Sequence, residues 1–205
     1  MILAWAQRLL DRYGVLTRET ALLEPAAPAW REFVEPLTRA ELRDELRRGY
    51  FVEGLSGLQF ALPETVGSLA RYAAGSADDS SLLLVPSLDP ANLYGSGAPF
   101  DIPLLEGGRA KLIRQPGNAI IQKSGRPILI IESWAKRLTG LPSASEDELR
   151  QAMALIPALA GPSRRVLKVE TYNSAPIQDT PAADNLAAFG FVRDLNAMTY
   201  YALWS

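Results

Sequence analysis

Hydrophobic residues near the N-terminus recur at helical spacing. Residues 2–13 place apolar side chains three or four positions apart, and Gly14 follows where a helix would end. Thr17 then predicts the N-cap of a short second helix over residues 18–24, because its hydroxyl can accept a hydrogen bond from a free N–H of the first turn. The chain is therefore expected to open with two helices and a short break between them.

A third amphipathic segment spans residues 30–43. Pro36 lies inside it and lacks the N–H that a helix interior uses, so we expect this helix to be kinked or split. Thr38, followed three residues later by Glu41, would cap the second piece. The pattern thus predicts a third helix, in one piece or in two.

Two β-prone runs come next, at residues 50–52 and 58–62. The loop between them, residues 54–57, contains two glycines, which allow the positive φ of a hairpin turn. Three helices followed by a hairpin predict a winged helix over residues 1–75, a helix-turn-helix variant that docks on duplex DNA. Residues 75–81 are polar and are expected to link this domain to a second one.

Residues 82–205 carry short apolar or alternating runs separated by proline and glycine turns. This pattern predicts an antiparallel β-barrel-like domain with two packed helices, so that the fold class of the whole chain is α+β. Ser145 and Glu148 have the spacing of a capping box at the first of these helices. The helices are expected at residues 145–159 and 181–189, and the strands at 82–85, 110–114, 118–123, 127–131, 135–138, 166–171 and 198–203.

The composition excludes several classes of site. With 205 residues and 48% hydrophobic content, the chain can bury one or two cores. It has no cysteine and no histidine, which excludes disulfides, zinc–thiolate and Fe–S sites, and Ser-His or Cys-His catalysis. No cofactor or metal is expected. Without a membrane-length apolar run or a leader pattern, the chain is expected to be cytoplasmic and to bind no membrane.

Charge is unevenly distributed along the chain. Residues 107–172 carry eleven Lys or Arg against five Asp or Glu, whereas residues 1–75 carry nine against ten. Clustered cations on one face could contact phosphates, or could simply form a solvated sheet face. Residues 76–106 carry five acidic residues and no basic one, which leaves open a role in protein interaction, including association of the chain with itself.

Several motifs, in order along the chain, resemble the C-terminal end of the Lhr-type (large helicase-related) bacterial helicases. The resemblance covers essentially the whole sequence. One departure is Asn173-Ser174, where the family would have Asn-Gly, so that this turn is expected to be less tight. The motifs are RRGYFVEGLSGLQFALPE at 47–64, DPANLYG at 89–95, GNAIIQKSGRPILIIE at 117–132, KRLTGLP at 136–142, LKVETYN at 167–173 and GFVRDLNAMTYYALW at 190–204.

The resemblance implies a winged helix and a β-barrel-like domain that follow a superfamily-2 ATPase core moving on single-stranded DNA. The chain itself contains no G-x-x-x-x-G-K-[ST] loop, so it cannot hydrolyse ATP by that chemistry. It is expected to be a piece of a longer repair helicase, with a free-standing relative as the alternative. Its expected partners are single-stranded or forked DNA and the helicase core of the same polypeptide.

DNA contacts are expected from the third helix, the hairpin and the basic strands. Tyr50 is expected to contact nucleic acid, and Phe51 and Phe60 to enter the core. Gln59 could read a base edge or satisfy the hairpin, and Trp134 is expected to close the barrel rather than to stack on a base. Acidic neighbours at Glu32, Glu35 and Glu41 oppose contacts from the third helix. The predicted DNA-binding residues are Arg31, Thr38, Arg39, Arg43, Arg47, Arg48, Tyr50, Lys111, Arg114, Lys123, Arg126, Lys136 and Arg137.

The family's C-terminal architecture is also similar to that of winged-helix DNA glycosylases, which implies a second function, excision of uracil or a damaged base. Such an enzyme needs a carboxylate or amide that positions water beside an oxocarbenium-like sugar, and a pocket for the extruded base. Asp89 is the predicted catalytic residue, although an Asp-Pro turn whose carboxylate accepts backbone N–H bonds is the favoured explanation of it. The accompanying candidates are Asn92 and Tyr94 in the same loop, then Asp101, Glu132 and Asp194.

Overall fold

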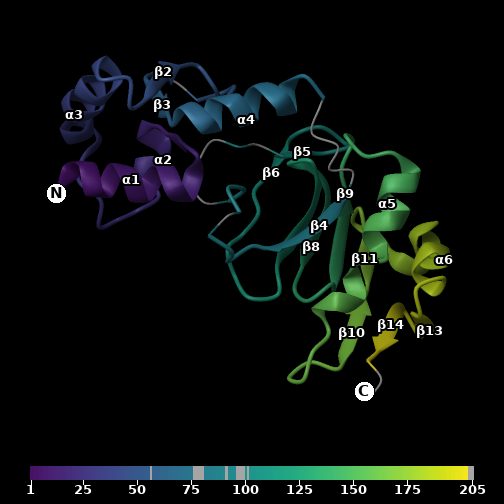
Figure 1. Ribbon diagram of the computed structural model, residues 1–205. Coiled ribbons are helices and arrows are strands. Elements are labelled where there is room, and N and C mark those ends of the chain that lie inside the picture. Colours follow the sequence, from purple (N-terminus) through teal and green to yellow (C-terminus); the bar gives the residue numbers. More distant parts are fainter. Residues whose placement is uncertain (56, 76–80, 91, 96–99, 101, 203–205) are drawn as a thin grey trace. The chain divides into compact units, whose positions relative to one another are not determined.

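The computed structural model describes residues 1–55, 57–75, 81–90, 92–95, 100 and 102–202 (Figure 1). These residues fall into two compact units. The first unit contains the described residues up to Gly75, and the second contains nearly all of those from Ser81 onward. Each unit has a hydrophobic core of its own, so each is described by itself.

The first unit combines four helices with a small antiparallel sheet of strand order β1-β3-β2 (Figure 1). Its core joins the inner faces of three helices to the central strand, and Phe33 and Phe60 are its largest fully buried side chains. Thr17 caps the second helix as predicted, since its hydroxyl accepts from the backbone N–H of Thr20 at 3.1 Å. The elements are α1 (Ile2–Tyr13), β1 (Val15–Leu16), α2 (Arg18–Leu22), α3 (Trp30–Leu42), β2 (Arg47–Gly49), β3 (Gln59–Ala61) and α4 (Pro63–Ala73).

The prediction of a cap at Thr38 is wrong. Helix α3 is a single helix that continues through Pro36. The hydroxyl of Thr38 donates to the backbone oxygen of Val34 at 2.8 Å, as a threonine inside a helix does. Phe33 and Leu37 flank the proline and are completely buried, so tertiary packing holds together a helix that local propensity disfavours.

The first hairpin strand lies earlier in the chain than predicted, while the second, β3, falls within its predicted range. Strand β2 ends at Gly49, and residues 50–52 form no strand. The pairing sets Arg48 opposite Phe60 and Gly49 opposite Gln59, so the ladder is short and the loop beyond it is long.

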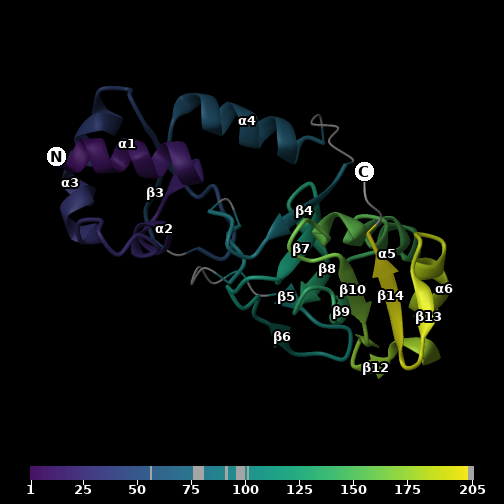
Figure 2. The same cartoon turned by 90° about the horizontal axis from the view of Figure 1, so that it is seen from below.

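The second unit is built around an open six-stranded sheet of order β12-β11-β9-β8-β7-β4 (Figures 1 and 2). Neighbouring strands are antiparallel except β9 and β11, which are parallel. The α+β class is therefore confirmed, but no sheet closes into a barrel within the described residues. The strands are β4 (Leu82–Pro86), β7 (Ala119–Lys123), β8 (Arg126–Glu132), β9 (Arg137–Gly140), β11 (Thr171–Tyr172) and β12 (Ala175–Pro176).

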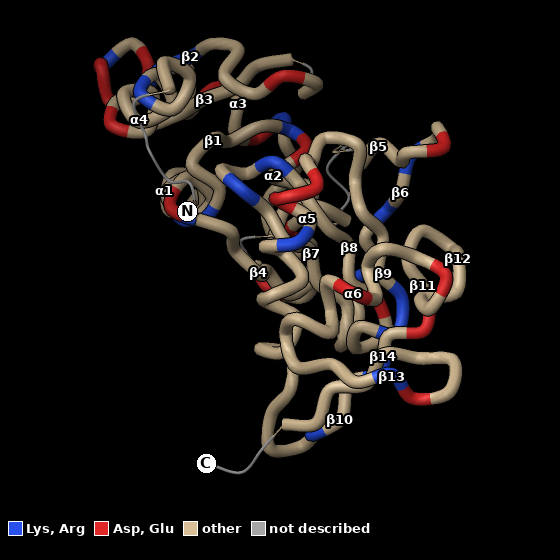
Figure 3. Tube along the Cα trace, turned by 90° about the vertical axis from the view of Figure 1, so that its right-hand side faces the viewer, with Lys and Arg blue, Asp and Glu red and all other residues tan. Residues whose placement is uncertain are grey.

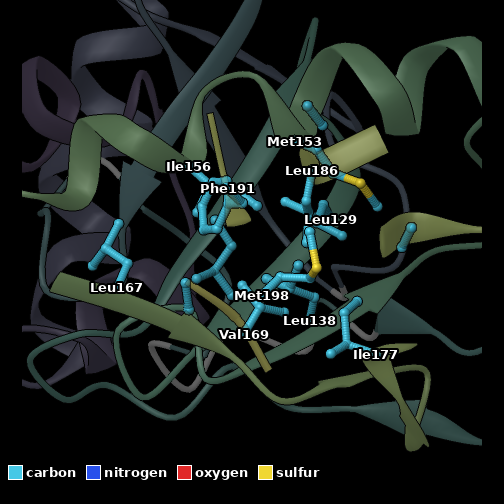
Figure 4. Close-up of a cluster of buried hydrophobic side chains, with 14 of the residues drawn as sticks. Leu129, Leu138, Met153, Ile156, Leu167, Val169, Ile177, Leu186, Phe191 and Met198 are labelled. Carbon is cyan, nitrogen blue, oxygen red and sulfur yellow. The ribbon is translucent and has the colours of Figure 1, made fainter. Parts of the chain in front are cut away.

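Both faces of this sheet are covered by apolar groups, which explains why it forms a layer. Ile121, Leu129 and Ile131 point into the larger core, which also takes side chains from the helices and from a three-stranded sheet of order β10-β14-β13 (Figure 4). Ile120 and Ile130 point the other way, into a smaller core. The elements of the larger core are α5 (Glu146–Met153), β10 (Val166–Val169), α6 (Ala182–Ala187), β13 (Val192–Asp194) and β14 (Ala197–Tyr201), with short 3-10 turns at η1 (Ile156–Leu159) and η2 (Ile177–Asp179).

The smaller core is covered by a short hairpin of β5 (Ile102–Pro103) and β6 (Arg109–Ala110). This corrects the predicted meander, in which residues 110–114 were a strand of the main sheet. Instead β4 pairs directly with β7. Ile102 and Leu112 are fully buried against the sheet, so the hairpin serves as a cover and not as a member of the sheet.

The turn between β11 and β12 is tight in spite of its serine. Tyr172 pairs with Ala175, which leaves only Asn173 and Ser174 in the turn. Their φ angles are 49° and 66°, the positive values that a two-residue type I′ hairpin requires. The expected loosening of this turn is therefore not observed.

Glu148 joins α5 to the β7–β8 hairpin. Its carboxylate accepts from Arg126 at 2.6 Å, from the backbone N–H of Ser145 at 3.0 Å and from Lys123 at 3.0 Å. These contacts lower the pKa of Glu148 from 4.5 to about 2, with the Arg126 bond as the largest cause. The capping box predicted from Ser145 and Glu148 is present. The ionised carboxylate is therefore the species that stabilises the fold.

We predict that Glu148→Gln lowers the free energy of unfolding by roughly 1–3 kcal/mol at pH 7, because charge-assisted bonds become neutral ones. The folded pKa of Glu148 is depressed, so its contribution is present above pH 4.5 and is lost as the pH falls towards about 2. Urea unfolding at a series of pH values should show the two proteins converging in acid. The exposed Glu146 of the same helical turn provides the control, and Glu146→Gln should change stability by less than about 0.5 kcal/mol.

Candidate functional site

The hairpin of the first unit is organised by the side chain of Gln59, which is completely buried. Its Oε1 accepts from the backbone N–H groups of Phe51 at 2.7 Å and Val52 at 2.8 Å. Its Nε2 donates to the backbone oxygens of Val52 and Leu55, both at 3.1 Å. Of the two roles weighed for Gln59, the structure shows the structural one, because the amide is fully engaged with its own loop.

Three aromatic residues of the hairpin have different environments. Phe60 is fully buried in the core of the first unit. Phe51 is half-buried and its ring covers Gly49, where an added Cβ would lie 2.9 Å from the ring. Tyr50 is 88% exposed, so its ring is accessible from solvent. Tyr50 is therefore the aromatic residue of this hairpin that could meet a base, and its contact with DNA stays a prediction.

The arginines predicted to bind DNA in the first unit lie next to acidic residues. Four of them form exposed ion pairs on α3 and in the segment that follows it, and Arg31 is exposed on α3. Glu32 instead accepts from the backbone N–H of Ala29 at 3.2 Å, at the start of the helix. Exposed pairs contribute little stability and can exchange partners. The pairs are Arg39–Glu35 at 2.5 Å, Arg43–Glu45 at 2.6 Å, Arg47–Asp44 at 2.5 Å and Arg48–Glu41 at 3.1 Å.

The predicted cations of the second unit are also held by neighbours. Lys123 and Arg126 bind Glu148, as described above. Lys136 pairs with Glu170 at 3.2 Å, and Arg137 with Glu132 at 3.4 Å. Lys111 is exposed. Figure 3 shows blue segments and red ones interspersed along the trace of this unit.

Asp89 lies in a turn that follows β4. Its backbone N–H donates to Pro86 at 3.1 Å, and its backbone oxygen accepts from Asn92 at 3.0 Å. The buried Asn92 side chain donates to the oxygen of Pro86 at 3.1 Å and accepts from the N–H of Tyr94 at 3.0 Å. The turn that explains the Asp-Pro sequence is therefore present, with the Asp89 side chain half-buried. A catalytic role of Asp89 stays a hypothesis.

Two further residues connect this turn to neighbouring loops. Arg114 donates to the backbone oxygens of Asn92 at 3.3 Å and Leu88 at 3.4 Å, so it braces the turn. Asn118, which is buried, donates to the oxygen of Ile113 at 3.0 Å and accepts from the N–H of Ser133 at 2.8 Å. Sequence reasoning did not single out Asn118. Its place after a Pro-Gly pair and before an apolar strand is the signal that could have identified it as a loop organiser.

The turn between β8 and β9 has an unusual backbone. Ser133, Trp134 and Ala135 have φ angles of 52°, 61° and 68°, values that non-glycine residues rarely adopt. The N–H of Trp134 donates to the oxygen of Gly117 at 2.7 Å. The guanidinium of Arg164 lies 4.5 Å from the centre of the Trp134 ring. The ring is thus already packed between protein groups, which favours a covering role over base stacking.

The other carboxylates proposed as catalytic groups are separate from Asp89 or engaged elsewhere. Glu132 ends β8 and faces Arg137. Asp194 belongs to the three-stranded sheet, where it accepts from Lys168 at 3.4 Å and Thr199 at 3.3 Å. Asp101 lies outside the described residues. Asn92 and Tyr94 share the Asp89 turn, and the Tyr94 hydroxyl donates to the oxygen of Gly125 at 3.1 Å.

The described residues contain no group of three or more His, Cys, Asp or Glu side chains placed to hold a metal ion. None of the helices in that part of the chain has both the length and the apolar character needed to cross a membrane.

Comparison with known proteins decides the nature of the first unit. Residues 1–81 match the family model of the winged-helix domain of the large helicase-related protein. These residues are an Lhr winged-helix domain. The four helices, the Gln59-ordered hairpin and the small sheet are the parts of that domain, and the hairpin is its wing.

Two curated Lhr proteins are similar to most of the chain. A protein of Mycolicibacterium smegmatis described as "Lhr helicase/ probable uracil glycosylase" is 28% identical over 179 residues, which is 85% of this chain. An Escherichia coli protein described as "Lhr helicase/uracil glycosylase" is 28% identical over 196 residues, 93% of this chain. The chain spans only 12% of the length of each relative.

Gly117, which lies against the Trp134 ring, should tolerate a side chain less well than Gly125. Gly117 has a φ of +84°, and an added Cβ would lie 2.4 Å from the Trp134 ring. Gly125 has a φ of +77° but open space around it. We predict that Gly117→Ala destabilises the protein by about 3 kcal/mol or more, and Gly125→Ala by about 1 kcal/mol. Thermal unfolding of both variants tests this difference, and equal losses would contradict the packing argument.

Proposed function

We propose that this chain is a nucleic-acid-binding accessory region of a larger Lhr-type helicase. The observation that carries the proposal is a winged-helix domain of the Lhr family whose wing presents an exposed tyrosine, Tyr50. Winged helices commonly engage DNA through a helix and the hairpin that follows it. In this proposal the winged helix binds the DNA strand, and a helicase core in the same polypeptide supplies ATP-driven movement along it.

The charge of the second unit supports the same function. Residues 107–131 contain five basic residues and no acidic residue. Arg109, Lys111 and Arg114 come first in this segment, and all three are exposed. Other basic residues of the chain form exposed ion pairs with carboxylates, and such pairs are weak. When DNA binds, its phosphates could replace those carboxylates. A single strand or a fork suits the wing of the first unit, because its exposed Tyr50 can stack on an unpaired base.

We expect the purified chain to bind a fluorescein-labelled single strand in low salt, with an affinity that falls as salt rises. Lys111→Ala should weaken binding and reduce the slope of log affinity against log salt by about 0.7 for one lost phosphate contact. Tyr50→Ala should weaken binding by about 1–3 kcal/mol with no change in that slope, because stacking releases no ions.

The control for charge is Arg193→Ala. Arg193 lies on β13, away from the basic segment in sequence, and pairs with Asp184 at 3.0 Å. The variant loses the same charge as Lys111→Ala, so equal effects would show that only net charge matters. Absence of binding in low salt would contradict the proposed function itself.

A second candidate function is base excision, in which this chain is a monofunctional glycosylase for uracil or a damaged base. The glycosylase in the descriptions of both relatives favours it, and it would give the protein a role in DNA repair. Asp89 supports it, because the hydrogen-bonded turn holds this carboxylate on a rigid backbone. A carboxylate there would position water and stabilise the developing positive charge on the sugar.

We predict that, under this second function, the chain produces alkali-labile sites in a uracil-containing oligonucleotide and that Asp89→Asn abolishes them. Asp184→Asn removes an exposed carboxylate from α6 and should leave the cleavage unchanged. The measurement is strand scission after hot alkali. Cleavage that persists in Asp89→Asn would exclude Asp89 as the catalytic residue, and no cleavage by the unaltered chain would exclude excision by this region alone.

A further inference from the structure

The second unit contains a further pocket. Its lining includes none of the residues discussed above for DNA binding or catalysis. It has a volume of about 190 Å³. This is below the roughly 300–1,000 Å³ of sites for drug-sized ligands, so it suits one small ring better than a whole nucleotide. Its lining residues are Leu104, Leu105, Glu106, Gly107, Thr139, Gly140, Asn173 and Ser174.

The pocket lies where the cover of the sheet stops. The β5–β6 hairpin buries Ile120 and Ile130 on β7 and β8. Thr139 pairs with Ile130 on the neighbouring strand β9, so it lies on the same face of the sheet, next to the cover. The hairpin turn supplies one wall through Leu104 and Leu105, and the β9 strand with the β11–β12 turn supplies the floor.

The floor is held rigidly. The side-chain oxygen of Asn173 accepts from the N–H of Gly140 at 2.8 Å, and the N–H of Asn173 donates to the oxygen of Leu138 at 3.0 Å. Gly140 leaves no space for a larger residue, because an added Cβ would lie 2.3 Å from the hydroxyl of Tyr172. The turn and the strand therefore form one fixed surface, which reduces the entropy lost when a ligand binds.

The side chains that line the pocket favour an uncharged polar ligand over an anion. Two leucines provide apolar contact, while Thr139 and Ser174 provide hydroxyl groups that both donate and accept. Glu106 contributes a carboxylate, and the lining contains no Lys or Arg. A phosphate would be repelled, whereas an uncharged polar ring would be accepted. The basic residues Arg109 and Lys111 follow Glu106 closely in sequence and could hold phosphates outside the pocket.

We propose that this pocket holds a single unpaired nucleobase turned out of a bound strand. The proposal rests on the proposed nucleic-acid binding and adds the place where one base is received. Bases that leave a stack are commonly held by hydrogen bonds to their polar edge and by apolar groups at their faces, which this lining supplies. The pocket thus gives the accessory region a contact with the base itself, beyond contacts with phosphates.

The test uses free nucleosides, because they have no phosphate. Deoxyuridine, thymidine, deoxycytidine, deoxyadenosine and deoxyguanosine are titrated in turn into the ¹⁵N-labelled chain. We expect at least one of them to shift the amide signals of Gly107, Gly140 and Ser174 in a saturable way. Absence of shifts at these residues with all five nucleosides, or shifts confined to other residues, would overturn the proposal.

Matched variants test the geometry. Thr139→Leu fills the floor and should weaken nucleoside binding by about tenfold, and Glu106→Gln should weaken it by several-fold. Ala187→Leu introduces the same side chain on the exposed face of α6 and should leave binding unchanged. An undisturbed spectrum elsewhere shows that each variant is folded. Equal binding by Thr139→Leu and the unaltered chain would overturn the proposal.

A strand-binding measurement separates this proposal from the proposed function. Thr139→Leu should still bind a labelled single strand in low salt, because its basic residues are intact. If strands bind but nucleosides do not, the nucleic-acid function stands and the pocket assignment fails. If nucleosides bind but strands do not, the pocket accepts free nucleosides only, and both the nucleic-acid function and the assignment of a base turned out of a strand fail.

Discussion

Burial of both faces of the six-stranded sheet is the constraint on which the second unit depends. Adjacent residues on β7, Ile120 and Ile121, point to opposite sides, and each side must exclude water. Two helices and a second sheet cover one face, and a two-stranded hairpin covers the other. A sheet that is apolar on both faces becomes the middle of three layers. Because other elements already cover both faces, the sheet does not need to close on itself to bury them.

The same constraint positions the polar groups. Side chains on the covered faces of a buried sheet cannot reach a ligand. The polar side chains available for binding therefore lie in the connecting loops. One group of loops contains Asp89, Asn118 and the turn at Trp134. Beyond the edge of the smaller cover, Thr139 and Asn173 remain accessible and form the floor of the pocket.

Buried side-chain amides hold the loops of both units. Gln59 satisfies four backbone groups of the wing, and Asn118 joins two loops of the second unit. An amide suits this role because it offers both donors and acceptors and carries no charge, so its burial requires no counter-ion. Loops held this way can present Tyr50 or Asp89 in one orientation, which is what binding or catalysis requires.

Local patterns in the sequence determined much of this protein. Helical spacing, the cap at Thr17 and the paired glycines of the hairpin predicted the winged helix, and the capping box at Ser145 predicted the start of α5, because each acts over a few residues. The order of the motifs along the chain indicated the Lhr family. Tertiary structure alone decided that β4 pairs with β7, that α3 continues through Pro36 and that Gln59 faces its own loop. It also placed Glu148 against Lys123 and Arg126, and brought Thr139 next to Asn173. These contacts join residues far apart in the chain or depend on burial, and a local pattern carries no information about which distant partner a side chain will meet.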